Sequence, residues 1–489
     1  MRTRSSAAMP TPDETAEGAA FTSGEVATLA GNSAALLFVR RIFLQAVSVL
    51  STAFVAREIG VGNFGELASA QGLLGLFQAL VDFGFSLVVA RELARHRRPG
   101  HWLGAALVSE GVLGITFSAI LGGIALVSGI TSVRGTILLV LVPSLAVAGI
   151  SPMRQVFLVT YRVRDLAKID VTTNLSQSLL TILIVLAGGG VVAVAVIFTV
   201  TSVLNTVWVS QSARRFTELR RPDRSDVRAL LHAALPIGLV SFMASVYFTI
   251  DLVILPYLVR SHAVGDYAAA IKILNLLATV PGLVMTAALP GMASLRHTRE
   301  GLGELAARIA HWLAAFALPG CVGAIVFAPT IVKLCFGSQY DASVPLLRVL
   351  SIAAALTALS ALLGTLLTSQ AVWRIQLIQN SIAMTVNIGG NVLFAPRFGP
   401  IASAWLTVLT EIIVDTGSLI ALRSRITLKP AMVSVVRPAI ACAVLPVFAF
   451  ALGRWPYLAL PVAGLGYLVA LILLGAWPTE LSFKRLRVD

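Results

Sequence analysis

Cysteine is scarce in this sequence, which has three (Cys321, Cys335 and Cys442) among 489 residues. All three fall in apolar stretches. Cys321 and Cys335 would lie about 21 Å apart along one helix, beyond the reach of a disulfide. We interpret the thiols as small packing residues. The six histidines are scattered near the ends of apolar stretches and lack the spacing of metal ligands, so no metal site is expected.

Charged residues are also few, at 12% of the chain, whereas 57% of the residues are hydrophobic. Apolar stretches of about 20 residues recur, which is the length that a helix needs to cross about 30 Å of hydrocarbon. These stretches lack the period-two alternation of a transmembrane β-barrel. The composition therefore predicts an all-α polytopic membrane protein.

Signatures of nucleotide chemistry are missing as well. The sequence has no phosphate-binding loop ending in Gly-Lys-Ser/Thr and no kinase motif set. The net charge of +14 is dispersed among short loops, so a nucleic-acid partner is not expected. Every expected outer loop is short, which disfavours a membrane glycosyltransferase or polysaccharide polymerase. The sequence predicts a protein that is not an enzyme and carries no cofactor.

The apolar stretches predict about fourteen spans grouped into two lobes and a terminal hairpin. The spans are 34–56, 65–90, 102–127, 135–158, 170–188, 190–211, 233–257, 267–290, 306–332, 344–367, 376–395, 399–421, 432–452 and 457–477. The expected organisation is a disordered cytoplasmic tail (1–32), an N-terminal six-helix lobe (33–213), a basic cytoplasmic linker (214–232), a C-terminal six-helix lobe (233–425), and an extra two-helix hairpin with a tail (426–489).

Basic residues gather in every second loop, whereas the intervening loops hold one at most. Lys and Arg beside a span are retained on the cytoplasmic side, so both termini are expected there. The longest basic loop carries six arginines, which can also contact anionic lipid headgroups: Arg214, Arg215, Arg220, Arg221, Arg224 and Arg228.

Two short segments of the chain are alike. Phe64-Gly65-Glu66-Leu67-Ala68 and Val264-Gly265-Asp266-Tyr267-Ala268 are offset by 200 positions, and each joins two apolar stretches. The similarity predicts one membrane hairpin built twice. Internal repeats of this kind in transporters place the substrate at the interface of the two copies.

Further motifs follow in a fixed order along residues 33 to 425. They are Arg57-Glu58-Ile59-Gly60, Asp82-Phe83-Gly84, Arg91-Glu92-Leu93-Ala94, Asp251, Leu289-Pro290, Phe336-Gly337-Ser338-Gln339-Tyr340, Asn387-Ile388 and Phe398-Gly399-Pro400. With the two repeated segments, this order resembles the polysaccharide flippases of the multidrug/oligosaccharidyl-lipid/polysaccharide exporter superfamily.

The resemblance implies a flippase in the bacterial cytoplasmic membrane that works by alternating access. It implies that a polyprenyl-pyrophosphate-linked oligosaccharide moves from the inner to the outer leaflet for cell-surface polysaccharide biosynthesis. A multidrug exporter of the same superfamily and a lipid II flippase stay open as alternatives. No feature demands an oligomer, so a monomer is expected, and polysaccharide polymerases or glycosyltransferases are partners to consider.

Ionisable residues inside spans cost free energy and so point to function. Arg40, Arg41, Asp82 and Glu110 are each expected roughly 10 to 12 Å below the cytoplasmic surface. Arg40 or Arg41 would bind the pyrophosphate with paired guanidinium donors, or would reach toward the headgroups instead. Asp82 or Glu110 would compete for the same arginine and couple transport to protonation or a cation.

Asp251 and Lys272 form a second expected pair near the outer surface. We expect either a structural ion pair or a site in which Lys272 holds phosphate and Asp251 releases it. Pro281-Gly282 near the middle of a span predicts either a hinge for alternating access or a static kink.

Further polar side chains lie in two late spans. Glu411 and Asp415 share a helix face at i,i+4, which favours a common partner, with Arg437 as one candidate. The asparagines of the 376–395 span (Asn380, Asn387 and Asn391) are expected to bond across helices rather than to read sugar hydroxyls.

Overall fold

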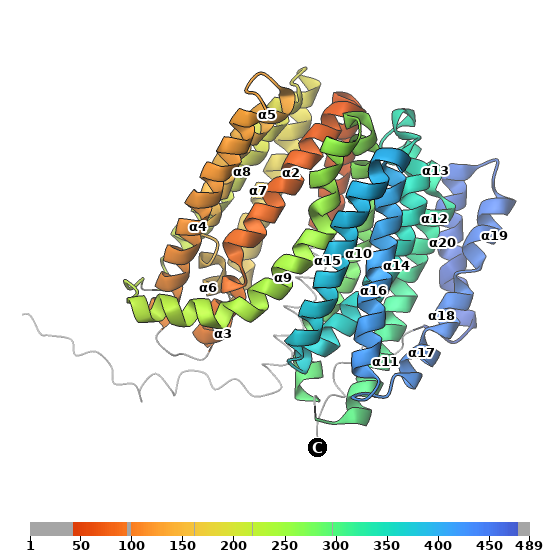
Figure 1. Ribbon diagram of the computed structural model, residues 1–489. Coiled ribbons are helices and arrows are strands. Elements are labelled where there is room, and N and C mark those ends of the chain that lie inside the picture. The colour runs from red at the N-terminus through yellow and green to blue at the C-terminus, as the bar shows by residue number, and fades with distance from the viewer. Residues whose placement is uncertain (1–42, 95–98, 161, 218, 296, 478–489) are drawn as a thin grey trace, which may run out of the picture.

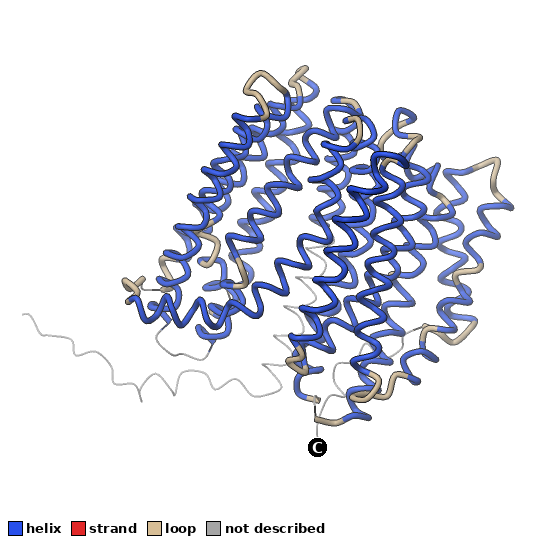
Figure 2. Tube along the Cα trace, viewed as in Figure 1, coloured by secondary structure: helices blue, strands red, loops and turns tan. Residues whose placement is uncertain are grey.

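The computed structural model describes residues 43–94, 99–160, 162–217, 219–295 and 297–477. Within these ranges the chain is almost entirely helical, with short connections and no strand (Figure 2). Because an apolar solvent offers no hydrogen bonds, a chain that crosses it must satisfy its backbone groups within each helix. The expected all-α fold class is confirmed.

The first half of the described chain forms one group of packed helices (Figure 1). It comprises the helical segment 43–59, α2 (Val61–Asp82), α3 (Phe85–Ala94), α4 (Pro99–Val127), α5 (Val133–Ala148), α6 (Met153–Val159), α7 (Val163–Leu186) and α8 (Val191–Ala213). α5 and α6 meet at an angle of 49° and together form one bent span.

The second half forms another group, with a terminal set of helices at its edge (Figure 1). The main group comprises α9 (Arg224–Leu258), α10 (Ser261–Ser294), α11 (Arg299–Phe316), α12 (Leu318–Val326), α13 (Ala328–Cys335), η1 (Ser338–Tyr340), α14 (Ser343–Ser369), α15 (Trp373–Phe398) and α16 (Pro400–Leu422). The terminal set comprises α17 (Lys429–Ser434), α18 (Val436–Ala441), α19 (Val444–Ala451) and α20 (Pro456–Leu473), which pack beside α11 and α12.

Eleven spans in the described ranges are long and apolar enough to cross a membrane, or twelve with the bent pair α5 and α6. The expected count of about fourteen is not confirmed. The first expected span begins outside the described residues. The eleventh corresponds to α15, which has 26 residues but carries several polar side chains and an arginine near each end.

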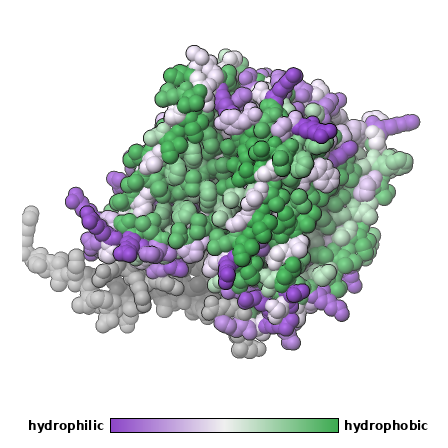
Figure 3. All heavy atoms as spheres, in the orientation of Figure 1, coloured by the Kyte–Doolittle hydropathy of each residue, from purple (hydrophilic) through white to green (hydrophobic). Residues whose placement is uncertain are grey.

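Apolar side chains cover the flank of the molecule, and polar side chains gather at its two ends (Figure 3). Phe450, Leu473 and Leu393 are 93%, 81% and 72% exposed. Water would disfavour so much apolar surface, whereas lipid tails solvate it. The flank therefore matches a multi-pass membrane protein.

Loop contacts define one end of the molecule, which we call the basic end. His101 lies 3.2 Å from Asp226, so the starts of α4 and α9 are neighbours. Arg299 donates to the carbonyl oxygen of Arg423 across 3.4 Å, which joins the start of α11 to the end of α16. The arginine-rich loop between α8 and α9 therefore lies at the basic end.

At the opposite end the two copies of the repeat touch. A Cβ atom added to Gly65 of α2 would lie 2.4 Å from the Ser261 carbonyl oxygen and 2.7 Å from the Gly265 nitrogen of α10. A Cβ atom on Gly265 would lie 2.0 Å from the Val61 carbonyl oxygen. Only glycine allows two helix backbones to approach so closely. We call this crossing the glycine seal and its end of the molecule the sealed end.

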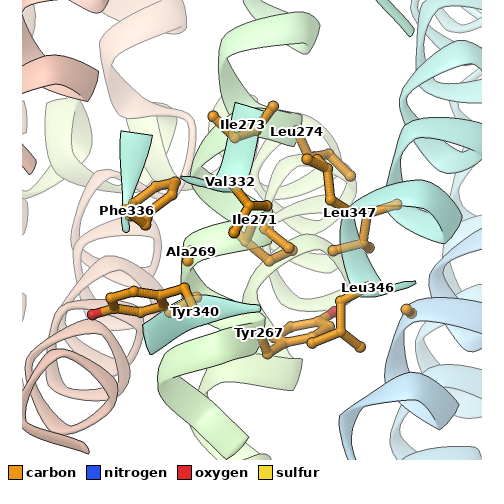
Figure 4. Packing of buried hydrophobic residues seen from close by; sticks show 14 of the residues in the cluster. Tyr267, Ala269, Ile271, Ile273, Leu274, Val332, Phe336, Tyr340, Leu346 and Leu347 are labelled. Atoms are coloured by element: carbon orange, nitrogen blue, oxygen red, sulfur yellow. The ribbon is translucent and has the colours of Figure 1, made fainter. Parts of the chain in front are cut away.

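Polar and aromatic contacts surround the glycine seal. The Arg57 guanidinium donates to the carbonyl oxygens of Lys333 and Leu334 at the end of α13. The Tyr340 hydroxyl donates to the Ala56 carbonyl oxygen across 2.9 Å. Tyr340 and Phe336 are buried beside the core of α10 and α14 (Figure 4). The segment 43–59 is thus fastened to the second group of helices at the sealed end.

Candidate functional site

Asp251 lies at the centre of a buried polar cluster between α9, α10, α15 and α16. Its carboxylate accepts hydrogen bonds from the Tyr267 hydroxyl at 2.6 Å, the Asn391 amide at 2.8 Å and the Thr407 hydroxyl at 3.2 Å. The Ser403 hydroxyl donates to the Asn391 oxygen at 2.5 Å, which fixes the orientation of that amide. Neutral donors from three helices therefore surround the carboxylate.

The asparagines of α15 form a ladder against α9. Asn380, Asn387 and Asn391 each bond to the residue 140 positions earlier, with distances of 3.4, 3.5 and 2.8 Å. A constant difference in sequence means that the two helices run parallel and in register. The expectation that these asparagines bond across helices is confirmed. These bonds explain why α15 carries several polar side chains inside a membrane.

The expected ion pair between Asp251 and Lys272 does not form in this conformation. Lys272 is half-buried on α10 and, within the described ranges, has no ion pair and no hydrogen bond. Tyr267 lies about one helical turn nearer the sealed end, and its hydroxyl donates to the carboxylate that Lys272 was expected to contact. Lys272 therefore leaves an uncompensated positive charge inside a span.

Polar or small residues form a stripe along each of the two repeated helices, α2 and α10. On α10 the stripe comprises Lys272, Asn275, Thr279, Gly282 and Thr286, and on α2 it comprises Gln71, Gly75, Gln78 and Asp82, all half-buried or exposed. The spacings of three and four residues place each set on one helix face. Both stripes start just beyond the glycine seal and run toward the basic end.

Asp82 and Glu110 lie near enough to interact electrostatically. Asp82 is half-buried at the end of α2 and accepts a bond from the Ser86 backbone nitrogen at 3.4 Å. Glu110 is fully buried, and its Oε2 atom accepts from the Ser151 hydroxyl at 2.8 Å, while Oε1 has no hydrogen-bond partner within the described ranges. Arg40 and Arg41, the cations expected beside these carboxyls, lie outside the described residues.

A polar network in the first group of helices was missed by the sequence analysis. The Arg154 guanidinium of α6 lies 2.7 Å from both carboxylate oxygens of Asp170 on α7 and 3.1 Å from the Asn205 oxygen on α8. The Asn205 amide in turn donates to Thr173 at 2.7 Å. Both charges fall inside expected spans, and that position was the signal that could have identified them.

Pro281 and Gly282 lie within α10, which stays helical through both residues. Among the described residues, nothing lies within 4 Å of a Cβ atom added to Gly282, so the helix has room on that side. A hinge at this position stays a prediction. No group of three or more metal-ligating side chains occurs in the described part of the chain.

Comparison with known proteins identifies the family. The family model described as "polysaccharide biosynthesis protein" matches residues 54–345, which is 292 of the 489 residues. The chain is 21% identical over 383 residues to the "probable low-salt glycan biosynthesis flippase Agl15" of Haloferax volcanii, covering 76% of this chain and 79% of that protein.

Solved structures show the same fold. The lipid II flippase MurJ in its inward closed conformation superposes with a TM-score of 0.73 at 13% identity, covering 90% of this chain and 98% of that one. An outward-facing multidrug resistance transporter of the MATE family superposes with a TM-score of 0.60 at 14% identity, covering 80% and 95%. The chain belongs to the polysaccharide biosynthesis protein family, the polysaccharide flippases of the multidrug/oligosaccharidyl-lipid/polysaccharide exporter superfamily.

Proposed function

We propose that this protein flips a polyprenyl-pyrophosphate-linked oligosaccharide from the cytoplasmic to the outer leaflet of a bacterial cytoplasmic membrane. The observation that carries the proposal is Lys272, a half-buried ammonium group on a repeated helix that has no counter-ion among the described residues. An isolated charge inside a span is costly unless a ligand neutralises it. A pyrophosphate is the anion that such a carrier brings, whereas an organic cation would be repelled.

The polar stripes of α2 and α10 provide the path in this proposal. The basic end faces the cytoplasm, as the retention of Lys and Arg predicts. The glycine seal then closes the outer end, and the path is approached from the cytoplasmic side. Arg40 or Arg41 receives the pyrophosphate first, and Lys272 holds it nearer the seal. Opening the seal while closing the basic end would complete alternating access, with Pro281-Gly282 as the bending point.

Asp82, Glu110 and Asp251 are the proposed coupling residues. Asp82 lies at the basic end of the α2 stripe, opposite in charge to Lys272, and interacts electrostatically with Glu110. Neutralising Asp82 would therefore make the entrance more attractive to a pyrophosphate. Asp251 of α9 accepts a hydrogen bond from Tyr267, which lies about one helical turn closer to the glycine seal than Lys272 does on α10. A change in the charge of Asp251 would therefore affect the crossing of α10 and α2.

Flipping in proteoliposomes tests the proposal. A fluorescent polyprenyl-pyrophosphate oligosaccharide is reconstituted with the wild type, with Lys272→Gln, Arg40→Ala or Arg41→Ala, and with Lys272→Arg. Lys333→Gln is the matched control, because Lys333 is an exposed lysine of α13 outside the path. We expect Lys272→Gln to lose most flipping, Lys272→Arg to keep part of it, and Lys333→Gln to flip normally.

Parallel assays decide between the substrates. Lipid II and a fluorescent organic cation are offered to the same proteoliposomes. A wild type that ignores the lipid-linked glycan but expels the organic cation down an ion gradient would replace this proposal with a multidrug exporter. A wild type that flips lipid II alone would keep the role of Lys272 and change the glycan.

A further inference from the structure

Two carboxyl groups outside the proposed path lie together on α16. Glu411 and Asp415 are 0% and 4% exposed, and both contact α14. The expectation that they share a partner is confirmed, but the partner is Ser360 of α14 rather than Arg437. Neither carboxyl has a cation within 4.0 Å in the described part of the chain.

The hydrogens around Ser360 can be counted. Its Oγ atom is 2.5 Å from Glu411 Oε2 and 2.7 Å from Asp415 Oδ1. Contacts this short are those of O–H···O hydrogen bonds to a carboxyl group. Each needs its own hydrogen, since one hydrogen shared between two acceptors would leave both contacts longer. A serine hydroxyl supplies one hydrogen, so a carboxyl group must supply the other.

The unpaired oxygen identifies the carboxyl that holds this hydrogen. Asp415 Oδ2 is buried and has no hydrogen-bond partner in the part of the chain that the structure describes. A buried charge without a donor is costly, whereas a neutral carboxyl group avoids that cost. Glu411, in contrast, has a hydroxyl group beside each oxygen. Thr357 Oγ1 lies 3.1 Å from Oε1 and shares its one hydrogen with the Ala353 carbonyl oxygen at 2.9 Å. Asp415 therefore donates through Oδ1 to Ser360, and Ser360 donates to the Glu411 carboxylate.

A third helix brings an uncommitted hydroxyl group to the pair. Tyr247 of α9 is 5% exposed and interacts electrostatically with both carboxyls, yet its hydroxyl has no hydrogen bond in the described ranges. The other charged or titratable side chains on the helices packed against α16 make no ion pair with either carboxyl. They are Arg224, Asp226, Arg228, His232, Asp251 and Tyr257 of α9; His262, Asp266, Tyr267 and Lys272 of α10; Arg348 of α14; and Arg374 and Arg397 of α15.

We propose that Glu411, Asp415 and Ser360 form a proton-binding site, separate from the Asp251 cluster, that takes up and releases one proton per transport cycle. The site can pass its proton along without changing the electron count. The Asp415 hydrogen moves to Ser360 Oγ as the Ser360 hydrogen moves to Glu411 Oε2, and Glu411 then gives the proton to water that reaches the site. The reference to a cycle rests on the proposed flippase function.

Infrared spectroscopy of the purified protein in nanodiscs tests the proton site without any transport. We expect the carbonyl band of one protonated carboxyl group to disappear in Asp415→Asn, which removes the group that holds the hydrogen. Glu411→Gln should shift this band, because it replaces the carboxylate to which Ser360 donates. Ser360→Ala should shift this band, because it removes the acceptor. Ser351→Ala is the matched control, since that buried hydroxyl of α14 bonds to the Leu347 carbonyl oxygen. A band that survives unchanged in Asp415→Asn overturns the site.

Flipping under an imposed pH gradient tests the cycle. We expect the gradient to accelerate flipping by the wild type at least tenfold, and to change flipping by Asp415→Asn or Glu411→Gln less than twofold. Wild-type flipping that ignores the gradient, or variants that respond as the wild type does, would overturn proton coupling at this site. If the wild type flips nothing, the proposed flippase function fails, while the infrared band still decides whether the proton is bound.

Discussion

Gly65→Ala should shift the protein away from the conformation described here. The new methyl carbon would lie 2.4 Å from the Ser261 carbonyl oxygen, whereas ordinary contact begins at 3.4 Å. The helices α2 and α10 would have to separate by about 1 Å, the difference between those distances. Overpacking of this kind costs about 1–3 kcal/mol. Because the methyl group clashes while the seal is closed, the equilibrium should move toward an open seal by about 5- to 150-fold.

Distances between spin labels can report this shift. Labels at Thr131→Cys and Asp341→Cys, with Cys335 replaced by Ser, would place exposed probes on the two groups of helices at the sealed end. We expect Gly65→Ala to add a population with longer distances. Gly75→Ala is the matched control, because it changes the same residue type in α2 at a position where no described residue lies within 4 Å of the added carbon.

The control also removes a competing explanation. Alanine raises helix propensity equally at both positions, so propensity alone would affect the two variants alike. If Gly65→Ala and Gly75→Ala give the same distance distribution as the wild type, the seal does not open in the accessible range of motion. That result would refute alternating access through this end of the molecule.

Three further substitutions test the polar groups. Lys272→Gln should weaken binding of a pyrophosphate carrier by about 1.5–3 kcal/mol, or roughly 10- to 150-fold, because one charge-assisted hydrogen bond is lost; equilibrium binding at two salt concentrations checks this. Tyr267→Phe should lower the free energy of unfolding in detergent by about 1.5–3 kcal/mol, because the Tyr267 hydroxyl bonds to a carboxylate. The control Tyr467→Phe should lower it by only about 0.5–1.5 kcal/mol, because the Tyr467 hydroxyl bonds to a backbone carbonyl. Arg154→Ala should destabilise the first group of helices by about 1–3 kcal/mol, because Asp170 keeps neutral donors but loses the guanidinium group. Thermal unfolding should show that the double variant Arg154→Ala with Asp170→Ala recovers part of this loss.

Much of the fold could be predicted because membrane helices are long, local and apolar. The runs of about 20 apolar residues identified the spans, and the matching motifs at Gly65 and Gly265 identified the repeat. What the repeat could not reveal is that its two copies touch each other through those glycines. Close approach depends on how two helices are oriented in space, and spacing along the chain does not determine that.

The partners of the charged residues were the least predictable part of the site. Asp251 and Lys272 have opposite charges and lie on consecutive helices, yet Asp251 bonds to Tyr267. Charge and depth restrict which groups can meet, whereas the rotation of each helix about its axis decides which do meet. The rotation is set by packing along the whole helix, so it cannot be read from one residue. That Glu411 and Asp415 lie on one helix face could be predicted, because an i,i+4 spacing alone determines a shared face.

The chemistry of the site arises where the two copies of the repeat differ. Lys272 corresponds to Gly72 at the 200-residue offset, and a side chain at position 72 would meet Leu252 at 3.0 Å from its first carbon. A lysine therefore fits at this position of α10, whereas on α2 even its first side-chain carbon would crowd Leu252. Asp82 likewise corresponds to Gly282. The two exchanges place a positive charge near the glycine seal on one helix and a negative charge near the basic end on the other. In the proposed function, an anion that enters past Asp82 would move toward Lys272, so the departures from symmetry would give the path its direction.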